Sequence, residues 1–491
     1  MMETLTMATI DEEIRSSDEA QNFTAVLPEE LLVEIFSYLS FEDLINSVQF
    51  VSSHWREVSY DPHLWRERVY YPKQQDTDKQ IIEILKKTPK LRIFIADQRP
   101  VHSSVLYTLI DNCSDLRTLI LCRHQKLSFR LIKKLVQQCP NIEQLFLPNR
   151  ILNEAKLAQA IGQFSKLRNL SGVVLVDPRT SAFLKPIADG CPNLQHVDLT
   201  SMVCTFSDLS YLLYKKREKL HTLGLKLFSK EGKCTLPLLA HCQALKTLHL
   251  DSYGSLMVDV GFDSLQNLST LTTLCLQYLE GTDLNIILKL FENMAMSQLI
   301  ELSIMYYENY EDRLADVIIT NCPRLRRFQL VQCTNLSDQS LENFCHLRDL
   351  QSVHLDTTDI TSIGIEYLSN CRELRTLALV CCEKLQESSM ALMVNFENLQ
   401  ELTLDYCNIK GLPLDLIPSK LKHLQLLSIR CCLNKDREAV KQLLKEMPHL
   451  IVTDGMNECE QEMIGFRHEM SGDSNLGFMI EDAPYFYEIL N

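Results

Sequence analysis

The residues best suited to chemistry in this sequence are its cysteines and two histidines that stand close to aspartates. The chain contains 18 cysteines and 13 histidines. Zinc sites usually draw on paired Cys-x-x-Cys segments, and the sequence has none. His249 and Asp251, like His354 and Asp356, are two residues apart, a spacing that superficially resembles an acid–base or metal-binding pair. What these groups do depends on the elements that carry them.

A repeated frame, L-x-x-L-x-L, runs through most of the chain. The first apolar position of each unit, here called the anchor, recurs every 24 to 28 residues over 14 successive intervals. This period falls within the range of leucine-rich repeats, and its regularity predicts a repeat array. The anchors are Leu91, Leu116, Ile142, Leu167, Leu194, Leu220, Leu245, Leu271, Leu299, Leu325, Leu350, Leu374, Leu399, Leu424 and Leu450.

Each unit predicts a strand followed by a helix. In Leu374-Arg-Thr-Leu377-Ala-Leu379 the later leucines alternate with other residues at the period of a strand. The rest of each unit has helical spacing, and crossovers of one hand place successive strands in a parallel sheet. Since strands need about 4.8 Å of width and helices about 10 Å, the helices splay outward. We therefore expect an α/β fold, a curved solenoid whose strands line the concave face.

The cysteines follow the same frame, because ten of them stand three residues before an anchor or eight residues after one. A small thiol at a repeated core position packs like a hydrophobic side chain, whereas reactivity needs an exposed, electropositive environment. We expect structural cysteines, no catalytic residue, no metal site and no cofactor. Residues 85–452 resemble the cysteine-containing class of leucine-rich repeats. The ten are Cys113, Cys139, Cys191, Cys242, Cys322, Cys371, Cys333, Cys382, Cys407 and Cys432.

A different pattern precedes the repeats, at residues 27–65. Leu27-Pro28 suits a helix start, an apolar stripe follows at helical spacing, and Ser40 with Asp43 predicts the cap of a second helix. The segment resembles the F-box, and the resemblance rests on Leu27-Pro28-x-Glu30, Ile35-Phe36-x-Tyr38-Leu39, Asp43-Leu44, Trp55-Arg56 and Leu64-Trp65. It departs from the F-box pattern at Ser52, where that family usually has cysteine.

The resemblance implies a non-enzymatic substrate receptor of an SCF-type cullin–RING ubiquitin ligase. The F-box would bind a Skp-type adaptor that carries the cullin and RING protein, and the repeats would hold a protein substrate for ubiquitination and degradation. Three alternatives stay open: residues 27–65 merely cap the first repeat, the chain is a scaffold that binds the adaptor without ubiquitin transfer, or it is an enzyme. The residues implied to contact the adaptor are Leu27, Pro28, Leu31, Ile35, Phe36, Leu39 and Leu44.

Strand alternation also predicts which side chains face the inside of the solenoid. Neighbouring residues of a strand point to opposite sides, so positions two, four and six after each anchor face inward. These positions are apolar near the N-terminal end, which indicates a covered or binding surface. The two His–Asp pairs lie on this face, and we expect them to be solvated rather than catalytic. The candidate substrate contacts are Ile95, Ile120, Phe146, His249, Asp251, Arg327, His354, Asp356, Asp405 and Arg430.

Composition limits the partners and the location. The net charge of −15 argues against nucleic acid as a main partner, because phosphate binding needs a basic face. The sequence contains no apolar run of about 18 residues, no signal peptide pattern and no prenylation motif. We therefore expect no membrane anchor and a cytoplasmic or nuclear location, or both.

The patterns divide the chain into four parts. We expect a disordered acidic N-terminus at 1–22, the F-box at 23–70, a solenoid of about 14 repeats at 71–452 and a tail at 453–491. The tail is acidic but contains aromatic residues such as Phe478 and Tyr485, which disordered acidic tails rarely have. We expect the aromatic segment from Phe478 to Leu490 to fold back onto the concave face and to shape or occlude the substrate site.

Overall fold

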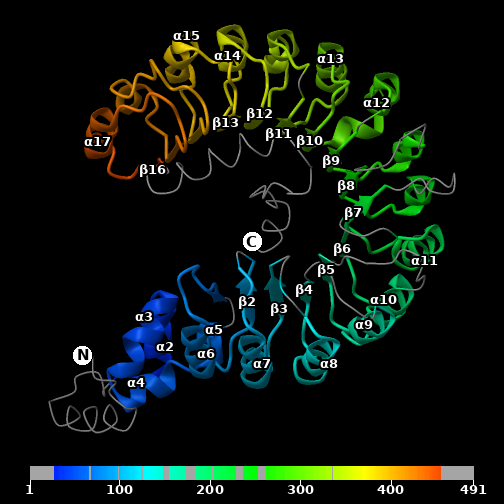
Figure 1. Cartoon of the computed structure of the whole chain (residues 1–491), viewed down its shortest axis with the longest axis vertical. Coiled ribbons are helices and arrows are strands. Elements are labelled where there is room, and N and C mark those ends of the chain that lie inside the picture. The colour runs from blue at the N-terminus through cyan, green and yellow to red at the C-terminus, as the bar shows by residue number, and fades with distance from the viewer. Residues whose placement is uncertain are drawn as a thin grey trace. The chain divides into compact units, whose positions relative to one another are not determined.

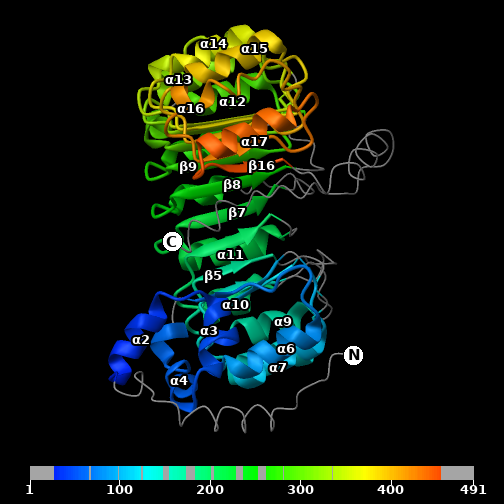
Figure 2. The ribbon, with the colours of Figure 1, turned by 90° about the vertical axis from the view of Figure 1, so that its left-hand side faces the viewer.

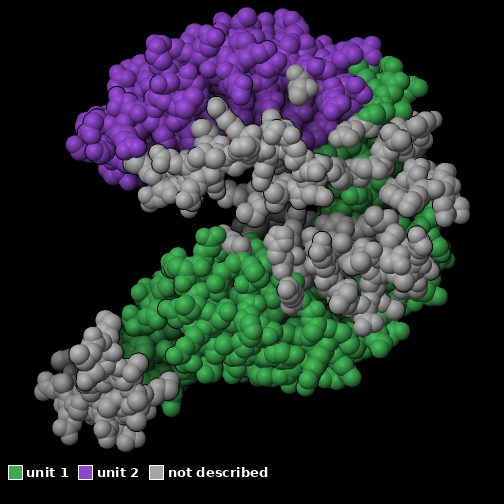
Figure 3. Space-filling model, in the orientation of Figure 1, with its two compact units in different colours: residues 1–301 green, residues 302–491 purple. Residues whose placement is uncertain are grey.

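The chain divides into two compact units, residues 1–301 and 302–491 (Figure 3). The division falls inside the repeat array, so the N-terminal helices and the first repeats belong to one unit. The expected disordered segment at 1–22 and the expected fold-back of Phe478 to Leu490 lie outside the described residues. The computed structural model describes residues 27–65, 68–97, 99–122, 125, 127–147, 154–172, 183–200, 204–227, 236–252, 261–279, 281–292, 294–333 and 335–454.

The first unit begins with a small helical cluster that has its own core. Ser40 caps the second helix as predicted, since its hydroxyl accepts a hydrogen bond from the Asp43 amide at 3.0 Å. Trp65 closes the core, and its indole N–H donates to the Ser59 carbonyl at 2.7 Å. The helices are α2 (Glu29–Ser37), α3 (Phe41–Asn46), η2 (Val48–Phe50), α4 (Ser53–Val58) and α5 (Pro62–Trp65). The buried core residues are Leu32, Phe36, Leu44, Ile45, Val48, Val58, Leu64 and Trp65.

Alternating strands and helices follow in the first unit, with the strands in one layer and the helices in the other (Figures 1 and 2). The strands are β1 (Val69–Tyr70), β2 (Ile93–Ala96), β3 (Thr118–Leu121), β4 (Gln144–Phe146), β5 (Asn169–Ser171), β6 (His196–Leu199), β7 (Thr222–Lys226), β8 (Thr247–Asp251) and β9 (Thr273–Gln277). The helices are α6 (Asp78–Lys87), α7 (Ser103–Asn112), α8 (Phe129–Gln138), α9 (Glu154–Ile161), α10 (Leu184–Gly190), α11 (Phe206–Lys216), η3 (Leu236–His241), η4 (Phe262–Asn267), α12 (Leu284–Phe291) and η5 (Met294–Gln298).

The second unit repeats the same two layers. Its strands are β10 (Glu301–Met305), which begins at the division, β11 (Arg327–Val331), β12 (Ser352–Asp356), β13 (Thr376–Val380), β14 (Glu401–Thr403), β15 (Leu426–Ser428) and β16 (Ile451–Thr453). Its helices are α13 (Asp312–Asn321), η6 (Asp338–Leu341), η7 (Phe344–His346), α14 (Ser362–Ser369), α15 (Glu387–Ala391), η8 (Leu392–Asn395), α16 (Ile417–Lys420) and α17 (Arg437–Glu446).

The strands follow one another in chain order, and this confirms the predicted α/β repeat fold. The 16 strands of the described residues are ordered β1 to β16, with parallel pairing such as Leu377 opposite Val353 and Leu402. Burial alternates along β13, where Leu377 and Leu379 are buried and the residues beside them are half-buried. Every anchor precedes a strand, from β2 to β16. The anchors therefore predicted all the strands except β1.

The cysteines that stand eight residues after an anchor form a ladder in the second unit. Each thiol donates a hydrogen bond to a carbonyl of the preceding strand or just after it, from Cys407 to Leu379 at 3.3 Å and from Cys432 to Leu404 at 2.9 Å. Cys333 is fully buried, and burial raises the pKa of its thiol to about 12. All four thiols of the ladder are hydrogen-bonded as well as buried, which a purely hydrophobic role did not anticipate.

Neighbouring repeats of the second unit are also joined at their helix starts by aspartates. The Asp338 carboxylate accepts hydrogen bonds from the Thr361 amide at 2.8 Å, the Thr361 hydroxyl at 2.6 Å and the Gly364 amide at 2.9 Å. Gly364 lies on α14, and a Cβ atom added there would stand 2.5 Å from the carboxylate oxygen. Only glycine leaves room for this bridge between repeats.

We expect Gly364→Ala to destabilise the second unit despite alanine's better helix propensity. The clash with Asp338 outweighs the gain in propensity of roughly 0.5–1 kcal/mol, because overpacking typically costs about 1–3 kcal/mol. Thermal unfolding followed by circular dichroism should therefore show a lower melting temperature. Glu366→Ala, an exposed change on the same helix, is the matched control and should leave the melting temperature unchanged. An unchanged Gly364→Ala protein would mean that the Asp338 bridge contributes nothing.

Candidate functional site

The apolar stripe of α2 is split between the core and the solvent. Leu32 and Phe36 are fully buried, and the Phe36 ring packs edge-on against Trp55 with the centroids 5.1 Å apart. Leu31 and Ile35 are each 46% exposed, and Tyr38 is 82% exposed. Because these three follow each other at spacings of four and three residues, they share one side of the helix. We call Leu31, Ile35 and Tyr38 the exposed apolar face.

The structure separates the expected adaptor contacts into two groups. Leu31, Ile35 and Pro28 are exposed, whereas Leu27 and Leu39 are partly buried against the core. The sequence pattern predicted all of these residues alike as adaptor contacts. The structure corrects this prediction, because side chains in a fully formed core support the surface rather than contact a partner. The fully buried pair is Phe36 and Leu44.

Two further features of this cluster were not predicted. Tyr38 was not among the expected contacts, although its position three residues after Ile35 could have revealed it. Ser52, the departure from the F-box pattern, is buried, and its hydroxyl accepts a hydrogen bond from the Trp55 amide at 3.1 Å. Serine therefore caps α4 at this position, and the departure does not disturb the cluster.

The family comparison agrees with this geometry. Residues 24–70 match the model of the F-box-like family. This part of the chain is an F-box-like domain. It comprises α2 to α5 and ends at β1.

Several solved structures align with most of the chain at low identity. A Listeria monocytogenes internalin shares 17% identity at a TM-score of 0.40, over 78% of this chain and 95% of that one. The structure of the TLR13–ssRNA13 complex shares 14% at 0.43, over 76% and 57%. That of the yeast Rad7–Elc1 complex shares 15% at 0.45, over 92% and 98%. At these identities and TM-scores the resemblances do not bear on function.

In the first unit, the predicted inner face brings three apolar candidates together. Ile95, Ile120 and Phe146 lie in register on the adjacent strands β2, β3 and β4. Ile95 is almost fully buried, whereas Ile120 and Phe146 are half-buried. Of these three residues, Ile120 and Phe146 are therefore the ones that a partner could contact.

His249 stands farther along the same face of the first unit. It lies on β8 in register with Gly224 on β7 and Cys275 on β9. His249 and Asp251 are both half-buried. They lie several strands from the apolar row, so the first unit offers two separate groups of candidates rather than one site.

In the second unit, Asp405 is buried, whereas its neighbour Arg430 is exposed. Asp405 is only 2% exposed, and its carboxylate accepts hydrogen bonds from the Ser428 hydroxyl at 2.7 Å and the Arg430 amide at 2.8 Å. The Arg430 guanidinium also bonds to it, with 2.8 Å between Nε and Oδ2. Asp405 is thus a structural carboxylate that holds Arg430, and we no longer place it among the substrate contacts.

His354 and Asp356 do not form an acid–base pair. His354 Nδ1 lies 3.4 Å from the Gln329 amide nitrogen, while Asp356 accepts a hydrogen bond from the Thr357 hydroxyl at 2.7 Å. Burial lowers the pKa of His354, which keeps the ring neutral near pH 7. His354 is half-buried rather than freely solvated, and Arg327 on β11 is the exposed candidate of this group.

The described residues contain neither a metal-binding group nor a membrane-spanning helix. No group of three or more His, Cys, Asp or Glu side chains in this part of the chain is arranged to hold a metal ion. Within the same residues, every helix is too short or too polar to span a bilayer.

Proposed function

We propose that this chain is a non-catalytic substrate receptor of an SCF-type cullin–RING ubiquitin ligase. Its F-box-like domain binds a Skp-type adaptor, and the adaptor brings the cullin and the RING protein. The repeats hold a protein substrate for ubiquitination and degradation, in the cytoplasm, the nucleus or both. The observation that carries the proposal is the exposed apolar face on a domain whose core is complete without it.

The geometry also argues against a role as a mere cap of the repeats. A cap would turn its apolar surface toward the first repeat. Here Phe41 and Ile84 make that contact, because Phe41 stacks on Tyr70 of β1 and Ile84 of α6 packs against the helical core. The exposed apolar face remains available after this contact is made, and clustered exposed apolar side chains mark interaction surfaces.

Such a receptor accelerates ubiquitin transfer by proximity. Holding a substrate lysine near the charged ubiquitin-conjugating enzyme raises its effective concentration, often to the millimolar range for a short connection. No nucleophile or general acid of this chain takes part. The repeats supply the substrate surface, and the accessible candidates are Ile120, Phe146, His249, Asp251, Arg327, His354, Asp356 and Arg430.

Reconstitution tests the proposal and separates it from the scaffold alternative. The full chain is mixed with a purified Skp-type adaptor and a cullin–RING complex, and the species are separated by size exclusion. We expect one stable assembly that contains all the components. A complex with the adaptor that excludes the cullin would support the scaffold instead, and failure to bind the adaptor would overturn the proposal. Comparing the proteins that accumulate in cells when residues 27–65 are deleted would then identify substrates.

A further inference from the structure

Arg68 connects the start of β1, the first strand of the sheet, to helix α2 of the F-box-like domain. It lies just before β1, and its guanidinium donates to three carbonyls at the end of α2. The distances are 2.7 Å to Leu39, 2.9 Å to Phe36 and 3.2 Å to Ser37. These carbonyls belong to the negative end of the helix dipole, which favours a cation there.

The planar guanidinium suits this position better than any other cation. Its fork of N–H groups reaches several acceptors at once, and here two terminal nitrogens serve three carbonyls. Burial lowers the pKa of Arg68, but an arginine remains protonated in proteins. The side chain therefore acts as a fixed, charged connection between the two parts.

Aromatic contacts continue the connection into the sheet. Phe41 of α3 stacks on Tyr70 of β1, with 5.0 Å between the centroids and 4° between the ring planes. Tyr70 in turn packs edge-on against Phe94 of β2 at 5.7 Å. An ion pair of 3.1 Å joins Glu42 of α3 to Lys73. The helices of the F-box-like domain thus contact β1 through Phe41, and β1 contacts β2 through Tyr70.

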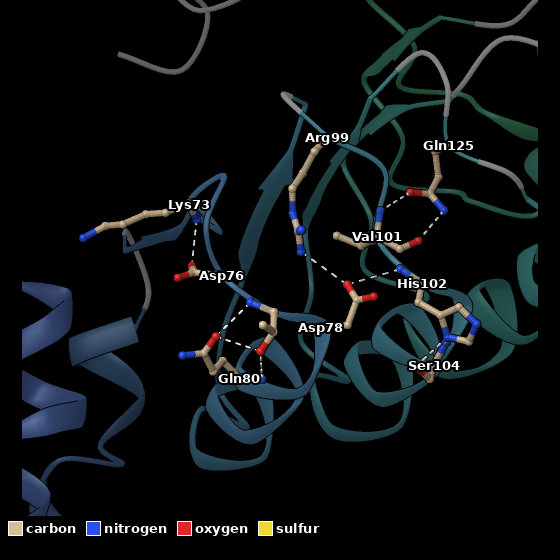
Figure 4. Close-up of polar contacts among 10 residues, drawn as sticks. Lys73, Asp76, Asp78, Gln80, Arg99, Val101, His102, Ser104 and Gln125 are labelled. Carbon is tan, nitrogen blue, oxygen red and sulfur yellow. Dashed lines mark hydrogen bonds and ion pairs between the residues drawn. The ribbon is translucent and has the colours of Figure 1, made fainter. Parts of the chain in front are cut away.

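Contacts at helix α6 connect the F-box-like domain to the next repeats (Figure 4). Ile84 of this helix packs against the F-box-like core. At the start of the helix, Asp78 accepts hydrogen bonds from the Arg99 guanidinium at 3.3 Å and the His102 amide at 3.4 Å. The Gln125 side chain then pairs with the backbone of Val101 at 2.8 and 2.9 Å. The segments after β2 and β3 are thereby tied to the helix that touches the domain.

We propose that Arg68 is a positioning residue that fixes the direction in which the repeat sheet leaves the F-box-like domain. Its hydrogen bonds go to backbone carbonyls beside the exposed apolar face and not to the side chains of that face. Its role is to keep the two parts in one orientation, so that a bound substrate meets the transferred ubiquitin at a constant place. This consequence for transfer rests on the proposed receptor function, whereas the orientation itself does not.

The orientation can be measured directly in the full chain. Fluorophores are attached through non-natural amino acids at Glu34 of α2 and Gln137 of α8, both exposed, and single-molecule energy transfer gives the distribution of distances. Domains without a strong interface move relative to one another, so we expect Arg68→Met to widen the distribution roughly twofold. Arg68→Lys, which keeps the charge but loses the fork, should fall between the two.

Arg92→Met is the matched control. Arg92 is also a poorly exposed arginine of this unit, and it pairs with Asp115 at 2.8 Å within the repeats. Its loss should leave the distribution as narrow as in the unmodified chain. If Arg68→Met also leaves the width unchanged, the positioning role is wrong. Should Arg68→Met fail to fold, the comparison of Arg68→Lys with Arg92→Met decides in the same way.

A second readout connects the orientation to ubiquitin transfer. In the reconstituted ligase, mass spectrometry identifies which lysines of the chain itself become ubiquitinated. We expect Arg68→Met to spread modification over more lysines, while adaptor affinity changes by less than about threefold, because Arg68 bonds to backbone carbonyls and its loss leaves the exposed side chains of α2 in place. An unchanged lysine pattern beside a widened distance distribution would overturn the transfer consequence. Absence of adaptor binding in every variant would instead reject the proposed function.

Discussion

Leu377→Asp is expected to unfold the repeats around β13. Leu377 is fully buried, and it lies in register between Val353 of β12 and Leu402 of β14. The substitution removes a buried leucine side chain, worth about 1.5–3 kcal/mol. It also places a carboxyl group without partners in the core, at a cost of several kcal/mol more. Thermal unfolding followed by circular dichroism should show loss of the second unit's transition.

Two comparisons make this result interpretable. Leu377→Ala should cost about 2–5 kcal/mol, the usual range for a buried leucine, and so lie between the unmodified chain and Leu377→Asp. His354→Asp on β12 introduces the same charge on the other face of the sheet, where the side chain is half-buried. It should cost less than about 1 kcal/mol. If Leu377→Asp and His354→Asp lowered the free energy of unfolding equally, the predicted facing of the strands would be wrong.

The repeat fold was predictable because its signal is periodic and local. Each anchor predicts one strand by itself. A wrong assignment in one unit therefore does not change the strands that are predicted in the others. Strand β1 escaped prediction because Val69 and Tyr70 have no leucine frame. Its existence depends on pairing with β2 and on the Phe41–Tyr70 stack, which are contacts between segments that the sequence alone does not bring together.

The candidate site was predictable only in part, because helical spacing shows a stripe but not which part of it faces the solvent. The pattern treated Ile35 and Phe36 alike, yet Trp55 covers Phe36 and leaves Ile35 exposed. Asp405 shows that the alternation of side chains along a strand has the same limit as a predictor of exposure. Alternation placed it on the inner face, but β14 ends at Thr403, and the backbone after the strand turns the carboxylate toward Arg430.

Replacing Leu31 and Ile35 together by alanine is expected to abolish adaptor binding without unfolding the chain. Both side chains are nearly half exposed, so the truncations remove little from the domain's own core. Alanine is also the best helix former, which keeps α2 intact. Apolar anchors at the centre of an interface commonly contribute about 2 kcal/mol each, so the loss of both should lower the affinity about 1,000-fold.

The affinity of the full chain for a purified Skp-type adaptor, measured by isothermal titration calorimetry, tests the receptor account most directly. The matched control replaces Ile363 and Leu416 by alanine, since these apolar residues of the second unit are 52% and 42% exposed. We expect the unmodified chain and this control to bind equally well, and the Leu31 and Ile35 double variant to show no measurable heat while it keeps its melting temperature. Binding of the double variant at the unmodified affinity would contradict the account.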